Sequence, residues 1–499
     1  MDKRYYIGLD NGGTTTKCAL FDTTGSVLAV ASARVPSRKT SEGFTERDPE
    51  AWWQANVSVI REVVAKSEVD PAHVRALAST GFGGGIVMVG ADGRCVYPAI
   101  VSTDYRADRL LTSFNRDGKA DAVYERTLQR LWPGQPGMLL PWFKRNNPGV
   151  LEKTRHILSA KDYVRYRLTG YFAAEPTDAS NTNLFNLAGR AFDPEIFEIL
   201  GVPECYEKMP RVVLAPEANA GGLSIQAAAL TGLTPGIPVA AGLYDAASCT
   251  LASGITGADI LTVVLGTWVI TGHMTPNYDE LKGLNNGMCA YRDGWYFSEE
   301  SSPASASNLD WFVEHFYARR FADTGNVYEA CNRLVASKDP AASNLVFLPY
   351  LYGSNSIPEA RGTLLNLAGH HTSDDVLVAV YEGILFSVMQ HVKNLYPGEL
   401  PRLARFTGGI ARSKIWCQML ADVLGIPVET TACPEPGTLG VAICAAIADG
   451  AFADFEEASR AMTHVTGRYE PDAARHGVYM DKYATYEKAV ASIGAFYRP

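Results

Sequence analysis

The first residues whose types and spacing could do chemistry form the segment Asp10-Asn-Gly-Gly-Thr-Thr-Thr-Lys17. Glycines let a backbone approach an anion closely, and successive N–H groups together with hydroxyls can bind phosphate oxygens. The carboxylate of Asp10 could hold Mg²⁺, directly or through water, and Lys17 adds a positive charge. A plain hairpin turn is the alternative, because Gly, Asn and Thr also favour turns. The segment alone leaves both interpretations open.

Acidic residues at the ends of two predicted strands are the next candidates. Asp245 follows an apolar strand and precedes a helix, and ligands of open α/β sheets collect at the carboxyl ends of strands. A carboxylate there could accept a proton from a substrate hydroxyl, although Asp is also a preferred helix N-cap. Asp104, followed by Arg106, carries the same ambiguity at another strand end.

Glycine-rich turns also occur in the second half of the chain. Gly266-Thr267 follows a predicted strand and echoes the turn at residues 12–16, which indicates a duplicated architecture. Gly408-Gly409 and the glycines of segment 437–440 could admit a flat base against the backbone. Tight packing of a helix on a strand is the alternative for these glycines.

The elements that must position these residues alternate between strands and helices, which indicates an α/β fold. Asp48 and Pro49 are suited to begin a helix, and Ser373 and Ser413 are predicted to cap two more. Segment 434–440 is predicted to be a loop before a helix at 441–447. Strands are expected at residues 5–10, 17–22, 27–35, 74–80, 96–103, 237–243, 259–265 and 403–407.

Composition narrows the function classes. The 499 residues carry a formal charge of −9, which argues against nucleic acid or an anionic membrane as the main partner. The sequence lacks the P-loop, GxGxxG, GxSxG and HExxH motifs. Nine scattered cysteines without a CxxC pair favour reduced thiols and a cytoplasmic location. The N-terminus has no apolar core of a signal peptide, and the apolar run 439–448 is too short for a membrane span.

Taken together, the motifs resemble the FGGY family of carbohydrate kinases over nearly the whole chain. IGLDNGGTTTK resembles the family's first phosphate loop, TERDPEAWWQA its acidic-aromatic helix start, and AGLYDAAS the segment with the catalytic base. LGTW resembles the second phosphate loop. FTGGIARSKIWCQMLADVLGIPV is similar to the C-terminal motif, and PEPGTLGVAICAA to the segment after it.

The resemblance implies two actin-like (ribonuclease H-like) ATPase domains with a cleft between them, here expected at residues 1–253 and 254–499. It implies ATP and Mg²⁺ as cofactors, with Asp10 at the metal and Asp245 as catalytic base. The expected sugar-binding residues are Gly83, Gly84, Asp104, Arg106 and Asp245. The expected ATP-binding residues are Gly12, Gly13, Thr14, Thr15, Lys17, Gly266, Thr267, Gly408, Gly409, Ser413 and Gly437.

Within the family, the chain resembles a pentulose kinase of the L-xylulose kinase branch. The D-xylulose kinases carry Met-His where this chain has Gly83-Gly84. This chain also has Ser102 where they have a Trp, and Leu139 where a family motif has a Lys. We therefore expect phosphorylation of a ketopentose, L-xylulose at its C5 hydroxyl, by a homodimer. D-xylulose, ribulose or another polyol is the alternative substrate, and a sugar-sensing ATP-binding protein without turnover is the alternative class.

Overall fold

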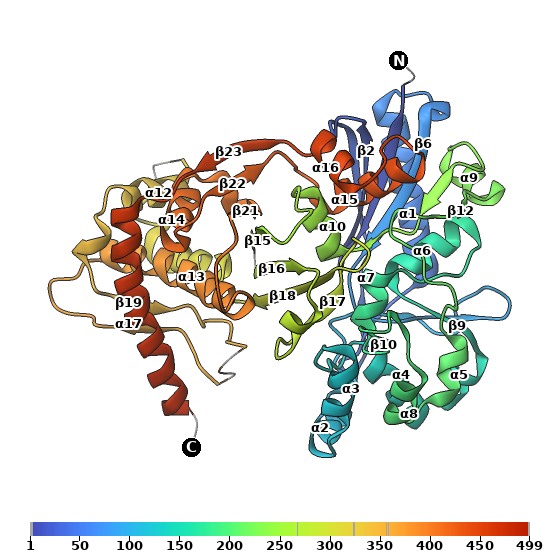
Figure 1. Ribbon diagram of the computed structural model, residues 1–499, viewed down its shortest axis with the longest axis horizontal. Helices are drawn as coiled ribbons and strands as arrows, with labels where there is room; N and C mark the ends of the chain where they lie inside the picture. The colour runs from blue at the N-terminus through green and yellow to red at the C-terminus, as the bar shows by residue number, and fades with distance from the viewer. Residues whose placement is uncertain (1–2, 267, 323–324, 356, 358, 498–499) are drawn as a thin grey trace. The chain divides into compact units, whose positions relative to one another are not determined.

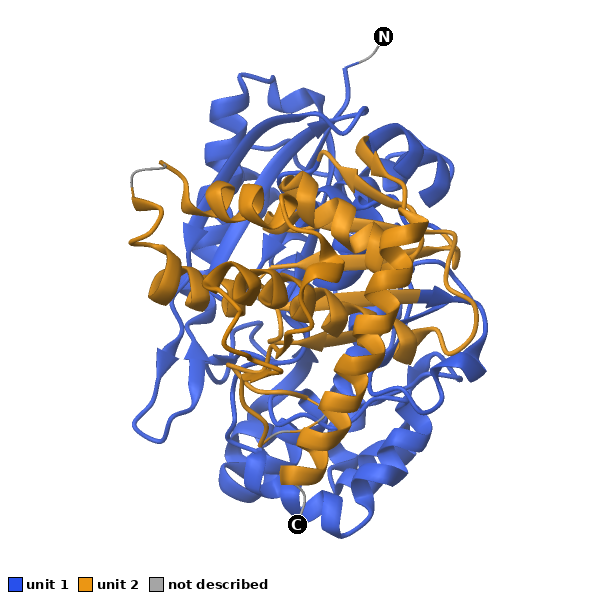
Figure 2. Ribbon diagram, turned by 90° about the vertical axis from the view of Figure 1, so that its left-hand side faces the viewer, with its two compact units in different colours: residues 1–256, 274–298, 433–464 blue, residues 257–273, 299–432, 465–499 orange. Residues whose placement is uncertain are grey.

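A computed structural model describes residues 3–266, 268–322, 325–355, 357 and 359–497. The chain divides into two compact units, which Figure 2 shows in different colours. Unit 1 comprises Met1–Thr256, Met274–Ser298 and Cys433–His464, and unit 2 comprises Gly257–His273, Glu299–Ala432 and Val465–Pro499. The predicted division at residues 253 and 254 stays a prediction about the functional domains.

Unit 1 is built on a seven-stranded sheet that begins with an antiparallel meander (Figure 1). Strand β1 then pairs in parallel with β6, and β6 pairs in parallel with β13 and β14. The carboxyl ends of these parallel strands therefore meet at one edge. The strands are β1 (Tyr5–Asn11), β2 (Thr15–Asp22), β3 (Val27–Arg34), β6 (Val74–Gly81), β12 (Asn219–Gly222), β13 (Pro238–Ala240) and β14 (Leu243–Tyr244).

Helices cover the unit 1 sheet because packing against it buries the apolar side chains on one side of each helix. Helix α1 begins as predicted, with Asp48 as N-cap and Pro49 in the first turn, and it packs on β2 and β3. Helix α15 packs on β1, β6 and α10. The helices around this sheet are α1 (Pro49–Ser67), α6 (Ala160–Thr169), α7 (Pro176–Ala179), α9 (Ile225–Thr231), α10 (Asp245–Ala252), α15 (Pro436–Ala448) and α16 (Phe455–Met462).

A second apolar cluster in unit 1 gathers short helices around Met138, Leu140 and Phe143. Its helices are α2 (Asp108–Arg116), α3 (Lys119–Thr127), α4 (Pro136–Asn146), α5 (Pro148–Lys153) and α8 (Pro194–Leu200). Small sheets join this region, formed by β4 (Arg38–Lys39), β5 (Thr45–Arg47) and β8 (Ala99–Ile100), by β7 (Val87–Gly90) and β9 (Thr154–Leu158), and by β10 (Phe185–Asn186) and β11 (Ala191–Phe192).

Unit 2 repeats the strand pattern of unit 1. Strand β15 pairs antiparallel with β16 and parallel with β21, and β21 pairs in parallel with β22. The strands are β15 (Ile260–Leu265), β16 (Val269–Thr275), β18 (Tyr296–Ser302), β21 (Leu403–Thr407), β22 (Val428–Thr431) and β23 (Val465–Tyr469). The shared pattern confirms the predicted duplication of architecture.

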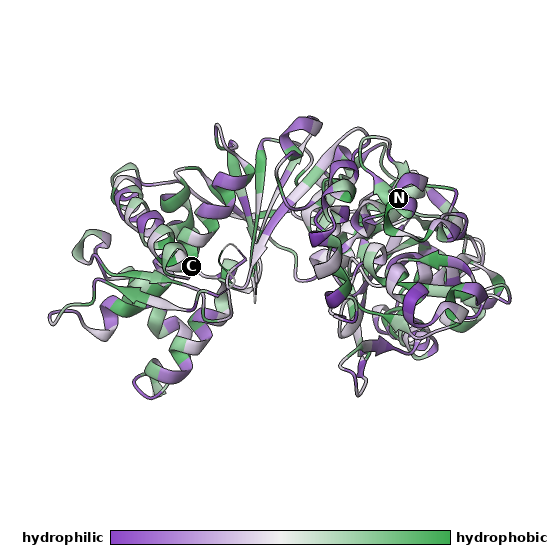
Figure 3. Ribbon diagram, turned by 90° about the horizontal axis from the view of Figure 1, so that it is seen from below, coloured by the Kyte–Doolittle hydropathy of each residue, from purple (hydrophilic) through white to green (hydrophobic). Residues whose placement is uncertain are grey.

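The helices of unit 2 include one long buried helix, α13 (Ser373–Leu395). In the described part of the chain, α13 alone is long and apolar enough to cross a membrane, but 83% of its most apolar window is buried inside the protein, as in a core helix. Figure 3 shows hydrophobic stretches running along the strands and helices of both units. The other helices are α11 (Ala306–Phe312), α12 (Val327–Ala336), α14 (Lys414–Leu424) and α17 (Ala473–Tyr497).

Three local predictions were wrong. Helix α15 begins at Pro436, so residues 436–440 are helical rather than a loop. The long helix α13 is capped by Thr372, which shares a capping box with Asp375, and not by Ser373. The strand predicted at 96–103 is reduced to the two residues of β8, because this segment pairs with the short strand β5 and otherwise makes only isolated bridges, such as that between Ile86 and Ile100.

Candidate active site

The parallel strands of unit 1 bring three predicted segments to one edge of the sheet. In β1 and β6, Asp10 is paired with Thr80 and Asn11 with Gly81. In β14 and β6, Tyr244 is also paired with Gly81. Asp10, the glycine loop after Gly81 and Asp245 therefore leave the same edge, where ligands of open α/β sheets collect.

Asp10 lies against the N-terminus of helix α15. A Cβ atom on Gly437 would lie 2.6 Å from Oδ2 of Asp10, so the helix can approach the carboxylate only because this residue is glycine. Burial raises the pKa of Asp10 to about 6, Lys17 lowers it and Glu435 raises it further. None of the residues that the structure describes donates a hydrogen bond to the Asp10 side chain, so its oxygens remain available to a ligand.

Lys17 is held by an acidic partner beside this carboxylate. Its Nζ atom lies 2.9 Å from Oε2 of Glu435, and this hydrogen bond raises the pKa of Lys17. Lys17 is also the cross-strand partner of Asp10 in β1 and β2. The predicted role of Lys17 at the nucleotide stays a prediction.

The loop Gly12–Thr15 is held by Arg47, which was not predicted as a site residue. The turn closes with the Gly12 N–H bonding to the Thr15 carbonyl at 3.0 Å. Arg47, which is 1% exposed, donates from Nη1 to the Gly12 carbonyl at 3.3 Å and from Nη2 to the Gly13 carbonyl. With its carbonyls engaged by a buried cation, the loop can present N–H groups and the Thr14 and Thr15 hydroxyls to a ligand. The motif TERDPE contains Arg47, but nothing in it points to this loop.

Asp245 is the first residue of α10, and its Oδ1 accepts the N–H of Ala246 at 2.7 Å. Cys249 lies one turn further along the same helix. Burial raises the pKa of the Cys249 thiol well above its ordinary value, and the charges of Asp10 and Asp245 raise it further. Asp10 and Asp245 therefore lie within electrostatic reach of the same thiol, so the two predicted carboxylates share one neighbourhood.

The segment that precedes Asp245 packs on a cluster of buried charges, none of whose side chains is more than 4% exposed. Lys161 pairs with Asp162 at 2.7 Å, with Glu175 at 3.4 Å and with Asp178 at 3.8 Å. Burial raises the pKa of Asp178 to about 7, Lys161 lowers it, and the negative charges of Asp162 and Glu175 raise it. The members are Lys161, Asp162, Arg165, Glu175 and Asp178.

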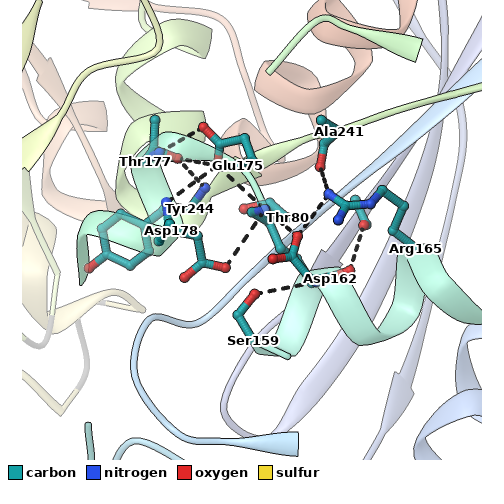
Figure 4. Close-up of polar contacts among 12 residues, drawn as sticks. Thr80, Ser159, Asp162, Arg165, Glu175, Thr177, Asp178, Ala241 and Tyr244 are labelled. Atoms are coloured by element: carbon teal, nitrogen blue, oxygen red, sulfur yellow. Dashed lines mark hydrogen bonds and ion pairs between the residues drawn. The ribbon is translucent and has the colours of Figure 1, made fainter. Parts of the chain in front are cut away.

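This cluster holds the strand that delivers Asp245 at two points (Figure 4). Arg165 donates to the Ala241 carbonyl at 2.9 Å. Thr177 accepts the Tyr244 N–H at 2.9 Å and donates to Oε2 of Glu175 at 2.7 Å. Between these anchors, Gly242 has φ +83° and its Cβ would lie 2.0 Å from the Ser79 carbonyl oxygen, so glycine is required at the turn. The backbone entering α10 is thereby fixed on both sides.

The predicted sugar-binding glycines lie beside this segment. A Cβ atom on Gly83 would lie 2.0 Å from Nδ2 of Asn181 and 2.4 Å from Cε2 of Tyr244. Gly84 has φ +71° and faces Ser102 and Gly134. Gly83 is therefore adjacent to the segment that carries Asp245, and Gly84 is the next residue in the same loop.

Asp104 and Arg106, the other predicted sugar contacts, form a closed pair. Oδ1 of Asp104 accepts the N–H and Nε of Arg106 at 2.9 and 2.8 Å, and Oδ2 accepts the Thr45 N–H at 2.6 Å. Arg106 also bonds to Glu46 at 3.0 Å. Both side chains are fully buried, so their observed contacts tie β5 to the loop after β8. A sugar contact for these two residues stays a prediction.

In unit 2, two glycine turns meet in the same way at the ends of parallel strands. Val264 of β15 is paired with Thr407 of β21, so Gly266 and Gly408 follow neighbouring strands. Gly408 has φ +100°, and its Cβ would lie 2.3 Å from the Leu265 carbonyl oxygen. The Gly266 carbonyl accepts the Ser305 hydroxyl at 2.9 Å. Thr267, predicted with Gly266, lies outside the described residues.

A cavity of about 940 Å³ opens beside these turns, within the size range of small-molecule sites. Gly409 and Ser413, both predicted to bind ATP, line it. Tyr381 and Trp416 stack at 4.3 Å along one side, and the Tyr381 hydroxyl donates to Asn332 at 2.8 Å. Its other lining residues, most of which lie on helices of unit 2, were not predicted as site residues. They include Asp310, Tyr328, Asn332, Arg333, Tyr381 and Gln418.

The described residues contain no group of three or more His, Cys, Asp and Glu side chains that could hold a metal ion. Mg²⁺ is commonly bound by one or two carboxylates together with substrate phosphates. The lone, available Asp10 carboxylate beside the Gly12–Thr15 loop fits that mode. These residues therefore fit a divalent ion that would be bound jointly by Asp10 and by the phosphates of the nucleotide.

Comparison with known proteins gives the same family over both halves. The N-terminal domain of the FGGY family of carbohydrate kinases matches residues 5–252, and the C-terminal domain matches residues 261–448. The chain is 35% identical to a probable L-xylulose kinase of Pasteurella multocida, over 98% of this chain and 99% of the relative. It is 33% identical to the L-xylulose/3-keto-L-gulonate kinase of Escherichia coli, over 99% of this chain and 98% of the relative.

Solved structures show the same fold. The xylulose kinase of Rhodospirillum rubrum matches with a TM-score of 0.89 and 26% identity, over 99% of this chain and 100% of that one. The gluconate kinase of Lactobacillus acidophilus matches with a TM-score of 0.90 and 22% identity, over 99% of both chains. The fold therefore consists of two actin-like ATPase domains. The chain belongs to the FGGY family of carbohydrate kinases, and it is a sugar kinase, a phosphotransferase that uses ATP to phosphorylate a small-molecule sugar.

Proposed function

We propose that the chain phosphorylates a ketopentose, with L-xylulose as substrate and its C5 hydroxyl as acceptor. The observation that carries the proposal is the meeting of Asp10, the Gly83-Gly84 loop and Asp245 at one edge of the unit 1 sheet. The names of the two relatives cited above support L-xylulose as the sugar. Glycines at 83 and 84 also distinguish the chain from the D-xylulose kinases it resembles.

In the proposed reaction, Asp245 accepts the proton of the C5 hydroxyl as that oxygen attacks the γ-phosphorus, and the bond to the β-phosphate oxygen breaks to release ADP. Phosphoryl transfer depends on positioning and on electrostatic stabilisation of the equatorial oxygens. In unit 1, the N–H groups of Gly13 and Thr14 and the hydroxyls of Thr14 and Thr15 would supply donors, because the Gly12 N–H already bonds to the Thr15 carbonyl. The predicted role of Gly266 at the nucleotide stays a prediction. Mg²⁺ held by Asp10 would neutralise phosphate charge when bound.

The nucleotide base is proposed to occupy the unit 2 cavity. Its stacked Tyr381 and Trp416 form an apolar side, and Asn332, Arg333 and Ser413 offer polar groups. Glycine at 409 leaves space, because nothing lies within 4 Å of a Cβ atom there. A flat heterocycle needs this combination of an apolar slot and a few polar contacts.

A coupled assay of ADP formation with L-xylulose, D-xylulose, L- and D-ribulose, erythritol and glycerol tests the proposal. We expect the highest kcat/KM with L-xylulose, by at least tenfold. A higher value with another sugar would replace the substrate but keep the activity. No sugar-dependent ADP formation at all would favour a sugar-sensing protein without turnover.

A further inference from the structure

Amide side chains from separate segments gather under the Gly83 turn in unit 1. Gln129 Nε2 donates to Oδ1 of Asn181 at 2.9 Å and to Oδ1 of Asn286 at 2.8 Å. Gln135 Nε2 donates to Oε1 of Gln129 and to Oδ1 of Asn181, both at 3.2 Å. Asn183 Nδ2 donates to Oε1 of Gln129 at 3.0 Å. Buried amide networks of this kind fix one arrangement, because each broken hydrogen bond leaves a buried polar atom unpaired.

The network determines which end of the Asn181 amide faces outward. Oδ1 of Asn181 receives N–H groups from both Gln129 and Gln135, so the amide cannot flip without losing both bonds. Nδ2 must then point away from the two glutamines. Asn181 is 7% exposed. Its Nδ2 donates to none of the residues that the structure describes, and it is not among the side-chain atoms sealed from solvent without a partner.

This donor lies at the proposed reaction site. Nδ2 of Asn181 would be 2.0 Å from a Cβ atom on Gly83, and that same Cβ would be 2.4 Å from the ring of Tyr244. Tyr244 immediately precedes Asp245, the proposed base. A side chain at position 83 would cover Nδ2 or displace it, so the glycine leaves the donor uncovered.

We infer that Asn181 is a sugar-binding residue, whose Nδ2 donates a hydrogen bond to a hydroxyl or keto oxygen of the substrate. Gln129 and Gln135 act as positioning residues that hold the amide in this orientation. An uncharged donor in a cluster of amides matches a neutral sugar oxygen. The inference rests on the proposed function and adds to it the group that recognises the sugar.

A single isosteric substitution tests this role. In Asn181→Asp, the atom that accepts from Gln129 and Gln135 is kept, while the outward donor becomes an acceptor. Sites built to hydrogen-bond a substrate oxygen discriminate strongly when the match is lost. We expect the Kd of L-xylulose, measured by calorimetry, to rise by at least roughly 30-fold, with the Kd of ATP unchanged. An unchanged sugar Kd would overturn the inference.

Deoxy sugars separate a direct contact from a structural effect. Ketopentoses that lack one oxygen each, at C1, C3 or C4, should bind the wild-type protein more weakly than L-xylulose. In Asn181→Asp, removal of the contacted oxygen should cost nothing, while the other deletions keep their full penalties. Equal penalties in both proteins would show that Asn181 does not contact the sugar.

Gly83→Ala provides a second variant if Asn181→Asp does not fold. Its methyl group would cover Nδ2, so we expect the same loss of sugar affinity and the same insensitive deoxy analogue. A Gly83→Ala protein with wild-type sugar affinity would contradict the inference. The proposed function fails separately, if the wild-type protein forms no ADP with any sugar. An active wild type with unaffected variants refutes only the role of Asn181.

Discussion

The position that a Cβ atom would occupy on Gly437 lies 2.6 Å from Oδ2 of Asp10. The first turn of α15 and the end of β1, which are more than 400 residues apart in sequence, are thus in contact at the proposed phosphate site. Ser248 of α10 fixes the same turn, because its hydroxyl donates to the Gly437 carbonyl at 2.7 Å.

Gly437→Ala should therefore disturb Asp10 selectively. The added methyl group must push the carboxylate or the helix aside, so we expect the KM for MgATP to rise by roughly tenfold or more, with sugar binding nearly unchanged. Steady-state kinetics with varied MgATP measure this. Gly149→Ala is the matched control, because nothing lies within 4 Å of its Cβ position. Equal KM values in the two variants would contradict the proposed role of Asp10.

The raised pKa of Asp10 predicts a pH dependence of nucleotide binding. Only the ionised carboxylate can hold a cation, so the affinity for MgATP should fall about tenfold per pH unit below about 6. Asp10→Asn should bind MgATP weakly at every pH, with no such slope. Calorimetric titrations between pH 5 and 8 check both expectations.

The same group affects the stability of the unliganded protein in the opposite direction. Its pKa rises from 3.8 to about 6 on folding, so its contribution to stability is present below pH 4 and is lost as the pH rises through 6. Relative to wild type, Asp10→Asn should be more thermostable at pH 8 than at pH 4. Melting temperatures that differ equally at both pH values would contradict the burial of an ionisable Asp10.

Thr177 is expected to position Asp245 through the Tyr244 backbone. Thr177→Val removes the acceptor of the Tyr244 N–H and the donor to Glu175. A small misplacement of a reacting group is costly, so kcat should fall roughly 10–100-fold. Thr177→Ser retains the hydroxyl and should keep kcat within about threefold of wild type. If Val and Ser variants were equally active, the cluster would serve stability alone.

The cavity of unit 2 offers an independent test. Gly409→Leu would place a side chain in the space proposed for the nucleotide base, since nothing lies within 4 Å of its Cβ position. The Kd of ATP should rise by roughly 100-fold while the Kd of the sugar stays unchanged. Gly369→Leu is the control, because its Cβ position is equally open and it does not line the cavity. Normal ATP binding by Gly409→Leu would place the base elsewhere.

Local sequence patterns predicted much of the framework. Apolar runs ended by glycine and polar residues located β1, β2, β6 and β15, and capping residues located the start of α1. Asp10 and Asp245 could be singled out because a carboxylate directly follows or ends a buried strand. The positions of these strands, of this helix start and of the two carboxylates depend only on residues close together in the sequence, within one strand or helix and the turn beside it.

Contacts between distant segments could not be predicted in this way. Residues 436–440 were expected to be a loop because glycines disfavour helices, but there they let α15 approach Asp10 and Ser248. Arg47 supports the Gly12 loop from 35 residues away, and Asn181 reaches Gly83 across nearly 100 residues. Asp104 is predicted as a sugar contact from its place at a strand end, but the sequence could not show that Thr45 and Arg106 donate to its oxygens.

The central claim, that Asp245 takes the proton of the sugar hydroxyl, is tested most directly by Asp245→Asn with L-xylulose and ATP. General-base catalysis contributes about 10²–10⁴-fold. We therefore predict a kcat lower by that factor, with an unchanged melting temperature and a Kd of ATP within about twofold of wild type. A kcat near the wild-type value would contradict the account.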